Sequence, residues 1–354
     1  MTAVREPATR EELADLLRAA SADGVPVAIA GAGTASRRGP AVAPPERVVS
    51  TLGLDRIISH EPADLTVTVE AGCRLEALQA ALAGRGQTWM QAPVRPGATV
   101  GGVLSTAASG RRRLRYGPVR DSVLQVVLAT GDGRIVSAGG KTVKGVAGYD
   151  IPRLVVGALG TLGVILEVTL KLWPVPPSSG WFTATGDVSG LAELGEALRR
   201  DLHLPAAVIL EPGSLSVEVI GPPADLVPPA GMSAGEAPPE PAWGAEVLVG
   251  VPPTRLPALA AALTAMGLPF QAELGVGTCR VGVETAGHVA AVRAAAVEQE
   301  GHAVVADAPP ELRGDPWGPP PPGVRLMERL RDAFDPAHVL NPGLFVGDAV
   351  RSPA

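Results

Sequence analysis

Thr99-Val-Gly-Gly102 opens a stretch, ending at Pro174, in which glycines and small hydroxyl residues repeatedly interrupt strongly apolar segments. A backbone needs such residues where it lies directly against a large, flat ligand that carries phosphate, because glycine has no side chain to hold the ligand away. One such cluster would be weak evidence, but several in one stretch form a specific signal. The clusters are Thr99–Gly102, Ser109-Gly110, Tyr116-Gly117-Pro-Val-Arg120-Asp121, Lys144-Gly-Val-Ala-Gly-Tyr149-Asp150 and Gly160-Thr-Leu-Gly163-Val164.

Length and composition limit the class of protein. A chain of 354 residues can hold two domains, and a net charge of -6 argues against a nucleic-acid partner. The two cysteines, Cys73 and Cys279, have no metal or redox spacing, which fits a reduced, cytoplasmic compartment. The N-terminus lacks the apolar core of a signal peptide, and no apolar run is long enough for a membrane helix. We therefore expect no integral membrane segment and no metal site.

Four arginines in five residues, Arg111, Arg112, Arg113 and Arg115, form the densest charge cluster of the chain. Two interpretations remain open for them. They can belong to a solvated loop, or they can contact an anionic ligand or a partner subunit.

The elements expected along the chain change in character near residue 174. Before it, a capping box at Thr9 begins a first helix that Gly24 can end, and strands alternate with glycine loops. After the Pro- and Ser-rich boundary at 174–179, strands at 208–220 and 245–250 and three helices indicate an antiparallel sheet with helices on one face. The segment 221–241 is dominated by Pro, Gly and Ala and predicts a disordered or extended insertion without a binding role.

A second glycine loop, Gly31-Ala32-Gly33-Thr34-Ala35, follows a short strand near the N-terminus. A Rossmann turn needs a third glycine, but Ser36 stands in its place, and no Gly-Lys-Ser/Thr completes a P-loop. The loop can still present successive backbone N–H groups to a diphosphate. Taken alone, this interpretation is no stronger than an ordinary turn.

Taken together, the glycine clusters resemble the FAD-binding domain of the FAD-linked oxidases, the vanillyl-alcohol oxidase or PCMH-type family. The resemblance covers residues 5–175 closely, and the terminal Asn341-Pro-Gly343 matches the end of that family. Within the family, it is strongest to the FAD-binding subunit of bacterial glycolate oxidases, through Gly110-Arg-Arg-Arg113 and the run from Gly139 to Asp150.

The resemblance implies an α+β fold in three segments. A PCMH-type FAD-binding domain of two subdomains spans 1–175. A smaller α+β cap domain with an antiparallel sheet spans 180–315 and contains the Pro-rich insertion 221–241. The C-terminal segment 323–354 returns to the FAD-binding domain.

The resemblance also implies FAD, bound non-covalently, and a set of residues that contact it. Departures from the family pattern at Ala30, Gly145 and Leu159 each remove a polar residue that many relatives carry. The residues implied to bind the cofactor are Gly31, Ala32, Gly33, Thr34, Ala35, Thr99, Gly101, Gly102, Thr106, Ser109, Gly110, Gly117, Arg120, Asp121, Gly160, Gly163, Val164 and Asn341.

Substrate chemistry is less evident than the cofactor site. Oxidation of a hydroxy acid needs a base for the hydroxyl proton and usually an arginine for the carboxylate. None of the five histidines has a recognisable partner or metal spacing, so the catalytic residues stay unassigned.

The leading hypothesis is an FAD-binding subunit of a glycolate-type 2-hydroxy-acid oxidase or dehydrogenase. It would act on a small hydroxy acid beside a larger FAD-linked catalytic subunit and an iron–sulfur subunit, in the cytoplasm or peripheral to the inner membrane through the complex. One alternative is a stand-alone FAD-dependent oxidoreductase for another hydroxy acid or alcohol. The other is a structural subunit whose flavin site has decayed.

Overall fold

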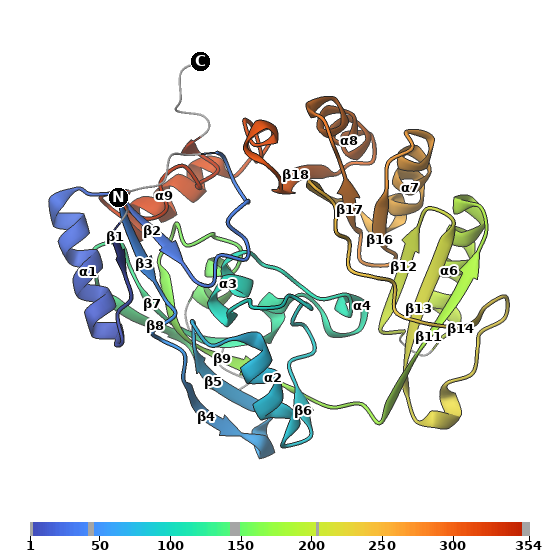
Figure 1. The fold of residues 1–354 in the computed structure, drawn as a ribbon, viewed down its shortest axis with the longest axis horizontal. Coiled ribbons are helices and arrows are strands. Elements are labelled where there is room, and N and C mark those ends of the chain that lie inside the picture. The colour runs from blue at the N-terminus through green and yellow to red at the C-terminus, as the bar shows by residue number, and fades with distance from the viewer. Residues whose placement is uncertain (1–2, 42–45, 142–148, 203–204, 349–354) are drawn as a thin grey trace.

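The computed structural model describes residues 3–41, 46–141, 149–202 and 205–348. The chain forms two α+β halves that lie side by side (Figure 1). The first half contains the N-terminal strands and helices together with the C-terminal segment, and the second half is built around one large sheet of strands between Ser178 and Asp307.

The first half begins with a small parallel sheet in the order β1-β3-β2. Helix α1 (Arg10–Asp23) packs on it through the fully buried Leu13 and Leu17. The hydroxyl of Thr9 accepts a hydrogen bond from the N–H of Glu12, as the capping box predicts. The strands are β1 (Ala3–Arg5), β2 (Val27–Ala30) and β3 (Arg47–Ser50).

A five-stranded antiparallel sheet forms the rest of this half, in the order β4-β5-β9-β7-β8. Its apolar residues pack with those of α2 and α3 into one core. The strands are β4 (Ile57–Glu61), β5 (Thr66–Glu70), β7 (Val123–Ala129), β8 (Ile135–Gly139) and β9 (Val164–Lys171), and β6 (Gln87–Thr88) pairs with β10 (Trp173–Pro174). The helices are α2 (Leu75–Ala83), α3 (Val100–Ser105), α4 (Arg113–Tyr116) and α5 (Ile151–Val155).

The C-terminal segment returns to the first half after α9 (Val324–Phe334). The N–H of Val27 donates to the carbonyl of Val339 at 2.8 Å, and the N–H of Asn341 donates to the carbonyl of Val27 at 2.9 Å. These bonds add residues 339–341 to the free side of β2. The last described residues therefore complete the first sheet of the chain.

The second half is an eight-stranded antiparallel sheet, which we call the cap sheet, in the order β14-β11-β13-β12-β16-β17-β15-β18. Three helices cover its outer face, away from the first half (Figure 1). The strands are β11 (Ser178–Thr185), β12 (Ala207–Glu211), β13 (Ser214–Gly221), β14 (Ser233–Gly235), β15 (Glu246–Gly250), β16 (Phe270–Glu273), β17 (Thr278–Gly282) and β18 (His302–Asp307), and the helices are α6 (Val188–Asp201), α7 (Leu256–Ala265) and α8 (Ala286–Glu298).

The fold class expected from the sequence is confirmed: a PCMH-type arrangement with antiparallel sheets and helices. The segment 208–220 is a hairpin of β12 and β13, with Gly213 at a positive φ of 82° in its turn. The insertion 221–241 differs from the expectation, because it contributes β14 to the edge of the cap sheet and contacts the first half. In the described ranges, no helix is long and apolar enough to cross a membrane.

Candidate functional site

A narrow cleft lies where the parallel sheet and the antiparallel sheet of the first half meet. It holds about 470 Å³, part of it open to solvent. Seven of the residues that the sequence predicts to bind the cofactor line this cleft. They are Gly31, Gly101, Gly102, Gly160, Gly163, Val164 and Asn341.

The glycines of the cleft have two different physical roles. A Cβ on Gly31 would lie 2.5 Å from Oγ1 of Thr99, and one on Gly101 would lie 2.8 Å from Cβ of Ala71. These two glycines are therefore required for the backbone segments to pack together. At Gly102, by contrast, a Cβ would meet only Oγ1 of Thr99, at 3.1 Å. A larger side chain at Gly102 would extend into the cleft itself.

The second glycine loop leaves the end of β2 with its backbone donors unpaired. No described group accepts a hydrogen bond from the N–H of Ala32, Gly33, Thr34 or Ala35. Gly33 has a positive φ of 73° and open space at its Cβ position. Successive free amides in such a turn form a concave site for an anion, as the diphosphate hypothesis requires.

Asn341 connects the two walls of the cleft. Its side-chain oxygen accepts from the N–H of Ile29 at 2.7 Å, and its side-chain nitrogen donates to the carbonyl of Leu159 at 2.6 Å. The residue is 6% exposed and has a positive φ of 43°. Both ends of its amide are thus used to hold the C-terminal segment against both subdomains.

The remaining predicted residues lie in three places, and the first holds Thr99 alone, the buried N-cap of α3. Thr106, Ser109 and Gly110 line a second cavity, next to the cleft across the end of α3. Gly117, Arg120 and Asp121 lie outside the walls of both, and Asp121 forms ion pairs with Arg120 and Arg153. Whether they contact the cofactor stays a prediction. The motif residues 142–148, including Lys144 and Gly145, are outside the described residues.

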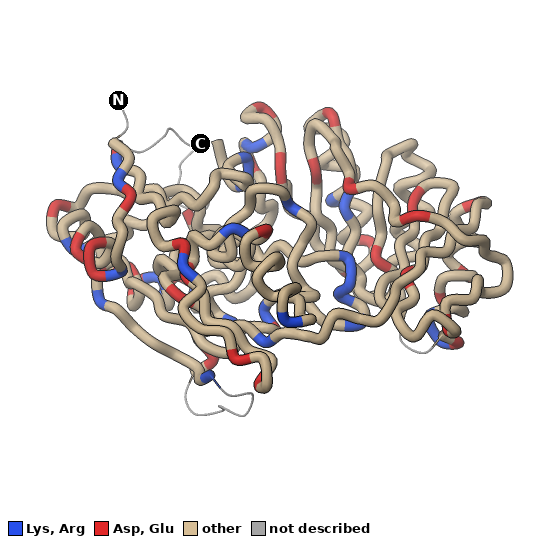
Figure 2. The backbone as a smooth tube through the Cα atoms, turned by 60° about the horizontal axis from the view of Figure 1, so that its bottom comes forward, with Lys and Arg blue, Asp and Glu red and all other residues tan. Residues whose placement is uncertain are grey.

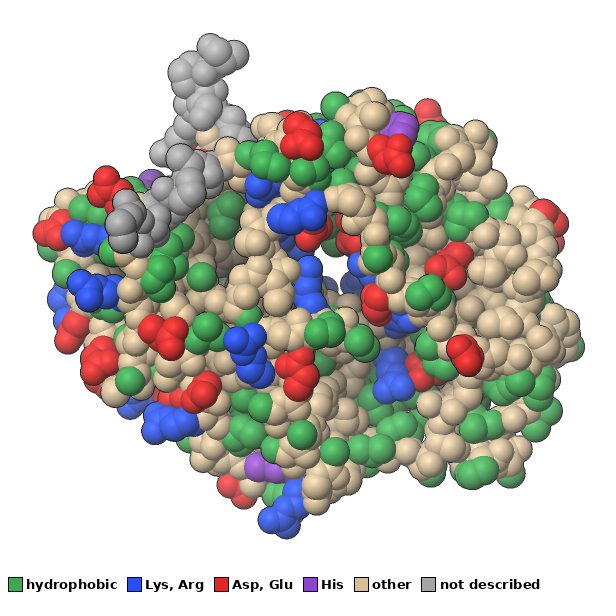
Figure 3. All heavy atoms as spheres, viewed as in Figure 1, with side chains coloured by type: hydrophobic (Ala, Val, Ile, Leu, Met, Phe, Trp, Pro, Cys, Tyr) green, Lys and Arg blue, Asp and Glu red, His purple; other side chains and the backbone are tan. Residues whose placement is uncertain are grey.

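The second cavity separates the two halves of the molecule and holds about 1470 Å³, including space open to solvent. The space-filling view shows an opening at this place, with basic and acidic side chains around it (Figure 3). The first half contributes residues 106–111 and the Arg37–Arg38 pair that follows the glycine loop. The cap sheet contributes residues of β15, β16 and β17.

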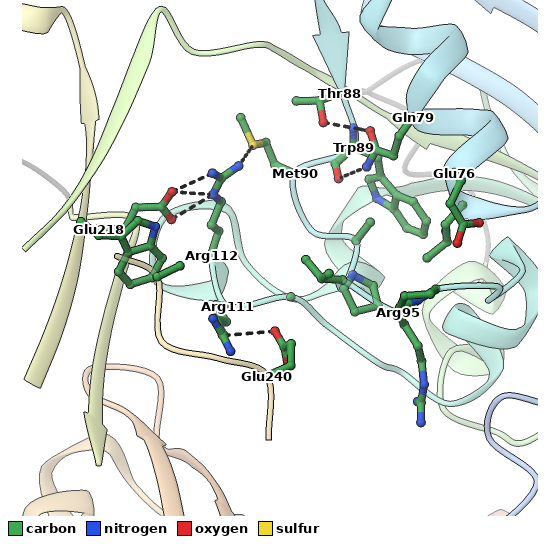
Figure 4. Close-up of a pocket in the computed structure, with 18 residues that line it drawn as sticks. Glu76, Gln79, Thr88, Trp89, Met90, Arg95, Arg111, Arg112, Glu218 and Glu240 are labelled. Carbon is green, nitrogen blue, oxygen red and sulfur yellow. Dashed lines mark hydrogen bonds and ion pairs between the residues drawn. The ribbon is translucent and has the colours of Figure 1, made fainter. Parts of the chain in front are cut away.

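The arginine cluster fastens the two halves together, and both earlier interpretations of it are incomplete. Several basic positions lie where the halves meet (Figure 2). Arg112 donates to the carboxylate of Glu218 at 2.7 and 2.9 Å (Figure 4), and Glu218 is only 1% exposed. The hydrogen bonds to Glu218 raise the pKa of Arg112. Arg111 donates to the carbonyls of Pro238 and Pro239, within the insertion.

Charged groups of the second cavity fall into paired and unpaired sets. Arg280 forms ion pairs with Glu246 at 2.6 Å and with Glu240 at 2.9 Å, so these three groups neutralise one another in part. Arg38 and Glu273 have no ion pair or side-chain hydrogen bond with any described group. Burial raises the pKa of Glu273 to about 7, against the opposing effect of Arg113, Arg280 and Arg111.

Sequence reasoning missed the charged residues of the cap sheet. Their signal is an alternation in which Cys279 and Val281 point to the helix-covered core, while Thr278 and Arg280 line the second cavity. On β16, Ala272 lies in the core and Glu273 lines the cavity. The alternation is visible in the sequence, but the sequence does not show that these side chains face the first half of the molecule.

Comparison with known proteins identifies the first half. The sequence profile of a family described as "FAD binding domain" matches residues 1–139. The residues present fit this cofactor, because the loop 32–35 offers free amides to a diphosphate and Gly102 leaves the cleft open beside it. The fold of the first half is thus that of a PCMH-type FAD-binding domain. More particularly, residues 1–139 match an FAD-binding domain, and the cofactor that this match indicates is FAD.

Relatives of the chain are named as oxidoreductases of hydroxy acids. A D-2-hydroxyglutarate dehydrogenase of Xanthomonas citri is 34% identical over 206 residues, which are 58% of this chain and 44% of the relative. A D-lactate dehydrogenase of Archaeoglobus fulgidus is 38% identical over 173 residues, 48% of this chain and 38% of the relative. Glycolate oxidase subunit GlcE of Escherichia coli is 40% identical over 125 residues, 35% of this chain and 36% of the relative. The matches thus span less than half the length of these curated relatives.

A solved structure resembles nearly the whole chain in fold. An alkyldihydroxyacetonephosphate synthase superposes with a TM-score of 0.66 over 96% of this chain and 75% of the other. The two sequences are 14% identical, so the likeness concerns the fold alone.

Proposed function

We propose that this chain is an FAD-binding subunit of a glycolate-type 2-hydroxy-acid oxidoreductase. The observation that supports it most is the arrangement of two adjoining spaces, a glycine-lined cleft and a charged cavity between the halves. The similarity to glycolate oxidase subunit GlcE and to the dehydrogenases of D-lactate and D-2-hydroxyglutarate agrees with this function.

The cofactor would be held mainly by backbone groups of the first half. We assign the diphosphate to the free amides of residues 32–35 and the rest of the nucleotide to the cleft beside Gly102. When bound, FAD supplies the two-electron acceptor for the hydride of the carbon that carries the hydroxyl group. Gly160, Gly163 and Asn341 would shape the cleft around the cofactor.

The charge of the second cavity favours an acidic substrate. Six arginines and four carboxylate residues line it, and the excess of positive charge attracts an anion. The six arginines are Arg37, Arg38, Arg95, Arg111, Arg113 and Arg280. A 2-hydroxy acid, with its carboxylate, has the charge that this cavity accommodates.

Electron transfer onward would require other subunits. Cys73 and Cys279 are both buried, and burial raises the pKa of both thiols, to about 11 for Cys73. Thiolate ligands for an iron–sulfur cluster are therefore not available from this pair. We propose that an iron–sulfur subunit and a larger FAD-linked subunit complete the complex.

The experiment is to purify the full chain and record its flavin absorption band. The band is then followed without oxygen after addition of glycolate, D-lactate or D-2-hydroxyglutarate, with and without the larger FAD-linked subunit. Bleaching that needs the larger subunit supports a role within a complex, whereas bleaching of the chain alone favours a stand-alone oxidoreductase. A colourless protein that does not take up added FAD would contradict the proposal and favour a structural subunit.

A further inference from the structure

Glu273 is the last residue of β16 and faces the first half of the molecule. Its neighbour Ala272 is fully buried in the cap core, so alternation along the strand places the Glu273 side chain on the opposite face, where it lines the second cavity. Its Oε2 atom is buried and has no hydrogen-bond partner among the described residues. A buried carboxylate oxygen without a partner is costly, which indicates a role other than stability.

Arg113 reaches the neighbourhood of Glu273 from the other half. Its Nη1 atom donates to Oγ1 of Thr278 at 2.7 Å, and Thr278 is the direct cross-strand neighbour of Glu273. Cross-strand neighbours have Cβ atoms about 5 Å apart. Arg113 is thus held beside Glu273, yet no ion pair joins the two, and Nε of Arg113 is also buried without a partner.

Other charged groups act on Glu273 from the cap sheet, from the segment before β15 and from the first half. Arg280 of β17 and Arg111 of the first half favour its ionised form, and Glu240 of the segment before β15 opposes it. Glu246 of β15 lies nearby but is paired with Arg280. Burial has the largest effect, and it raises the pKa of Glu273 to about 7. A carboxylate of this kind can both accept and release a proton near neutral pH.

From this arrangement we infer that Glu273 is the proton acceptor for the substrate hydroxyl, and that Arg113 binds the substrate carboxylate beside it. This inference rests on the proposed function. Oxidation of a 2-hydroxy acid breaks the C–H bond of the carbon that carries the hydroxyl group and the O–H bond of that hydroxyl. A C=O bond forms, which gives a 2-oxo acid. The two electrons leave with the hydrogen of the C–H bond as hydride, for which FAD held in the cleft would be the acceptor. The O–H proton needs a separate acceptor, and Glu273 takes it.

Histidine does not fill this role in the described part of the chain. None of the four described histidines lines the second cavity. His60 bonds to Gln87, and His338 bonds to Asp332 near the C-terminus. Among the described residues that line the second cavity, the carboxylate of Glu273 is thus the candidate for the base.

The first test measures the binding of oxalate to the FAD-loaded full chain, through the change in flavin absorption, between pH 5.5 and 8.5. Oxalate keeps a constant charge over this range, so a pH dependence reports on the protein. We expect the affinity of the wild type to fall at least about fivefold as Glu273 ionises near the bound anion. Glu273→Gln should bind oxalate equally at all pH values, while Glu240→Gln should keep the pH dependence. Parallel curves for wild type and Glu273→Gln would overturn the inference.

The second test follows flavin reduction by glycolate, D-lactate or D-2-hydroxyglutarate in a single turnover, in the complete complex. Glu273→Gln should retain its FAD and lose at least about 100-fold in reduction rate, the usual loss for a general base. Glu273→Asp should recover part of the rate and of its dependence on pH. An unchanged rate in Glu273→Gln would refute the proton-acceptor role. If none of the three acids reduces the wild type, the proposed function fails and the proton-acceptor role with it, while the oxalate titration still decides whether Glu273 faces an anion site.

Discussion

Replacement of Glu273 by Gln should make the stability of the protein less dependent on pH. The carboxyl has a pKa of about 7 in the folded chain, against 4.5 as its ordinary value. The folded state therefore binds this proton more tightly than the unfolded state does. Its contribution to stability is complete below pH 4.5 and is lost as the pH rises toward 7.

The size of the effect follows from the difference between the two pKa values. Each unit of difference corresponds to about 1.4 kcal/mol, so ionisation of Glu273 removes about 3 kcal/mol of the free energy of unfolding. Gln has nearly the same shape and no charge. The Gln variant should equal the wild type near pH 4.5 and exceed its stability by about 3 kcal/mol at pH 8.

Urea denaturation followed by circular dichroism, at several pH values between 4.5 and 8 and with FAD present throughout, measures this difference. Glu284→Gln is a suitable control, because Glu284 is exposed on the same half of the molecule. Its curve should run parallel to that of the wild type. A parallel curve for Glu273→Gln would show that the pKa of Glu273 is not raised in the folded chain, which would refute this reasoning.

Three further substitutions test the cleft and the contact between the halves. Gly102→Val should abolish flavin retention but leave the melting temperature within a few degrees of the wild type, because the new side chain extends into the cleft and not into the core. Normal flavin content in this variant would show that the nucleotide lies elsewhere. Asn341→Ala should lower the free energy of unfolding by about 2 kcal/mol, because two buried hydrogen bonds are lost, and it should also weaken FAD binding. Calorimetry measures the first effect and a flavin titration the second. Unchanged stability and affinity would contradict the role of Asn341 as a connector. Arg112→Ala should destabilise the protein by about 3 kcal/mol by leaving Glu218 buried without its partner. Adding Glu218→Gln to that variant should recover part of the loss in urea denaturation, and no recovery would argue against the ion pair as its cause.

The glycine-lined cleft was predictable from the sequence because its requirements are local. Gly31 and Gly101 stand where chain segments must pack closely, and such requirements are visible in the sequence itself. No sequence pattern identified Glu273, the candidate for the base. Glu273 is one carboxylate among many in the sequence, and its unusual environment arises only when Arg113, far earlier in the chain, is brought beside Thr278.

The insertion 221–241 is a second segment whose structure could not be predicted from its own residues. Its composition predicts a segment without a role, and composition reports only that the segment has little core of its own. Its order depends on contacts with Arg111 and with β11 in other parts of the chain. Contacts between distant segments cannot be read from either segment alone.

The return of residues 339–341 to β2 has a consequence for how the protein is made in the cell. During translation, β2 leaves the ribosome early, but the segment that pairs with it is synthesised only after the entire cap sheet. Until then the N–H of Ile29 lacks its acceptor and the cleft lacks the side chain of Asn341. A nascent chain should therefore capture flavin only after Asn341 has been synthesised, and a product interrupted before Asn341 should leave the ribosome without a functional cofactor site.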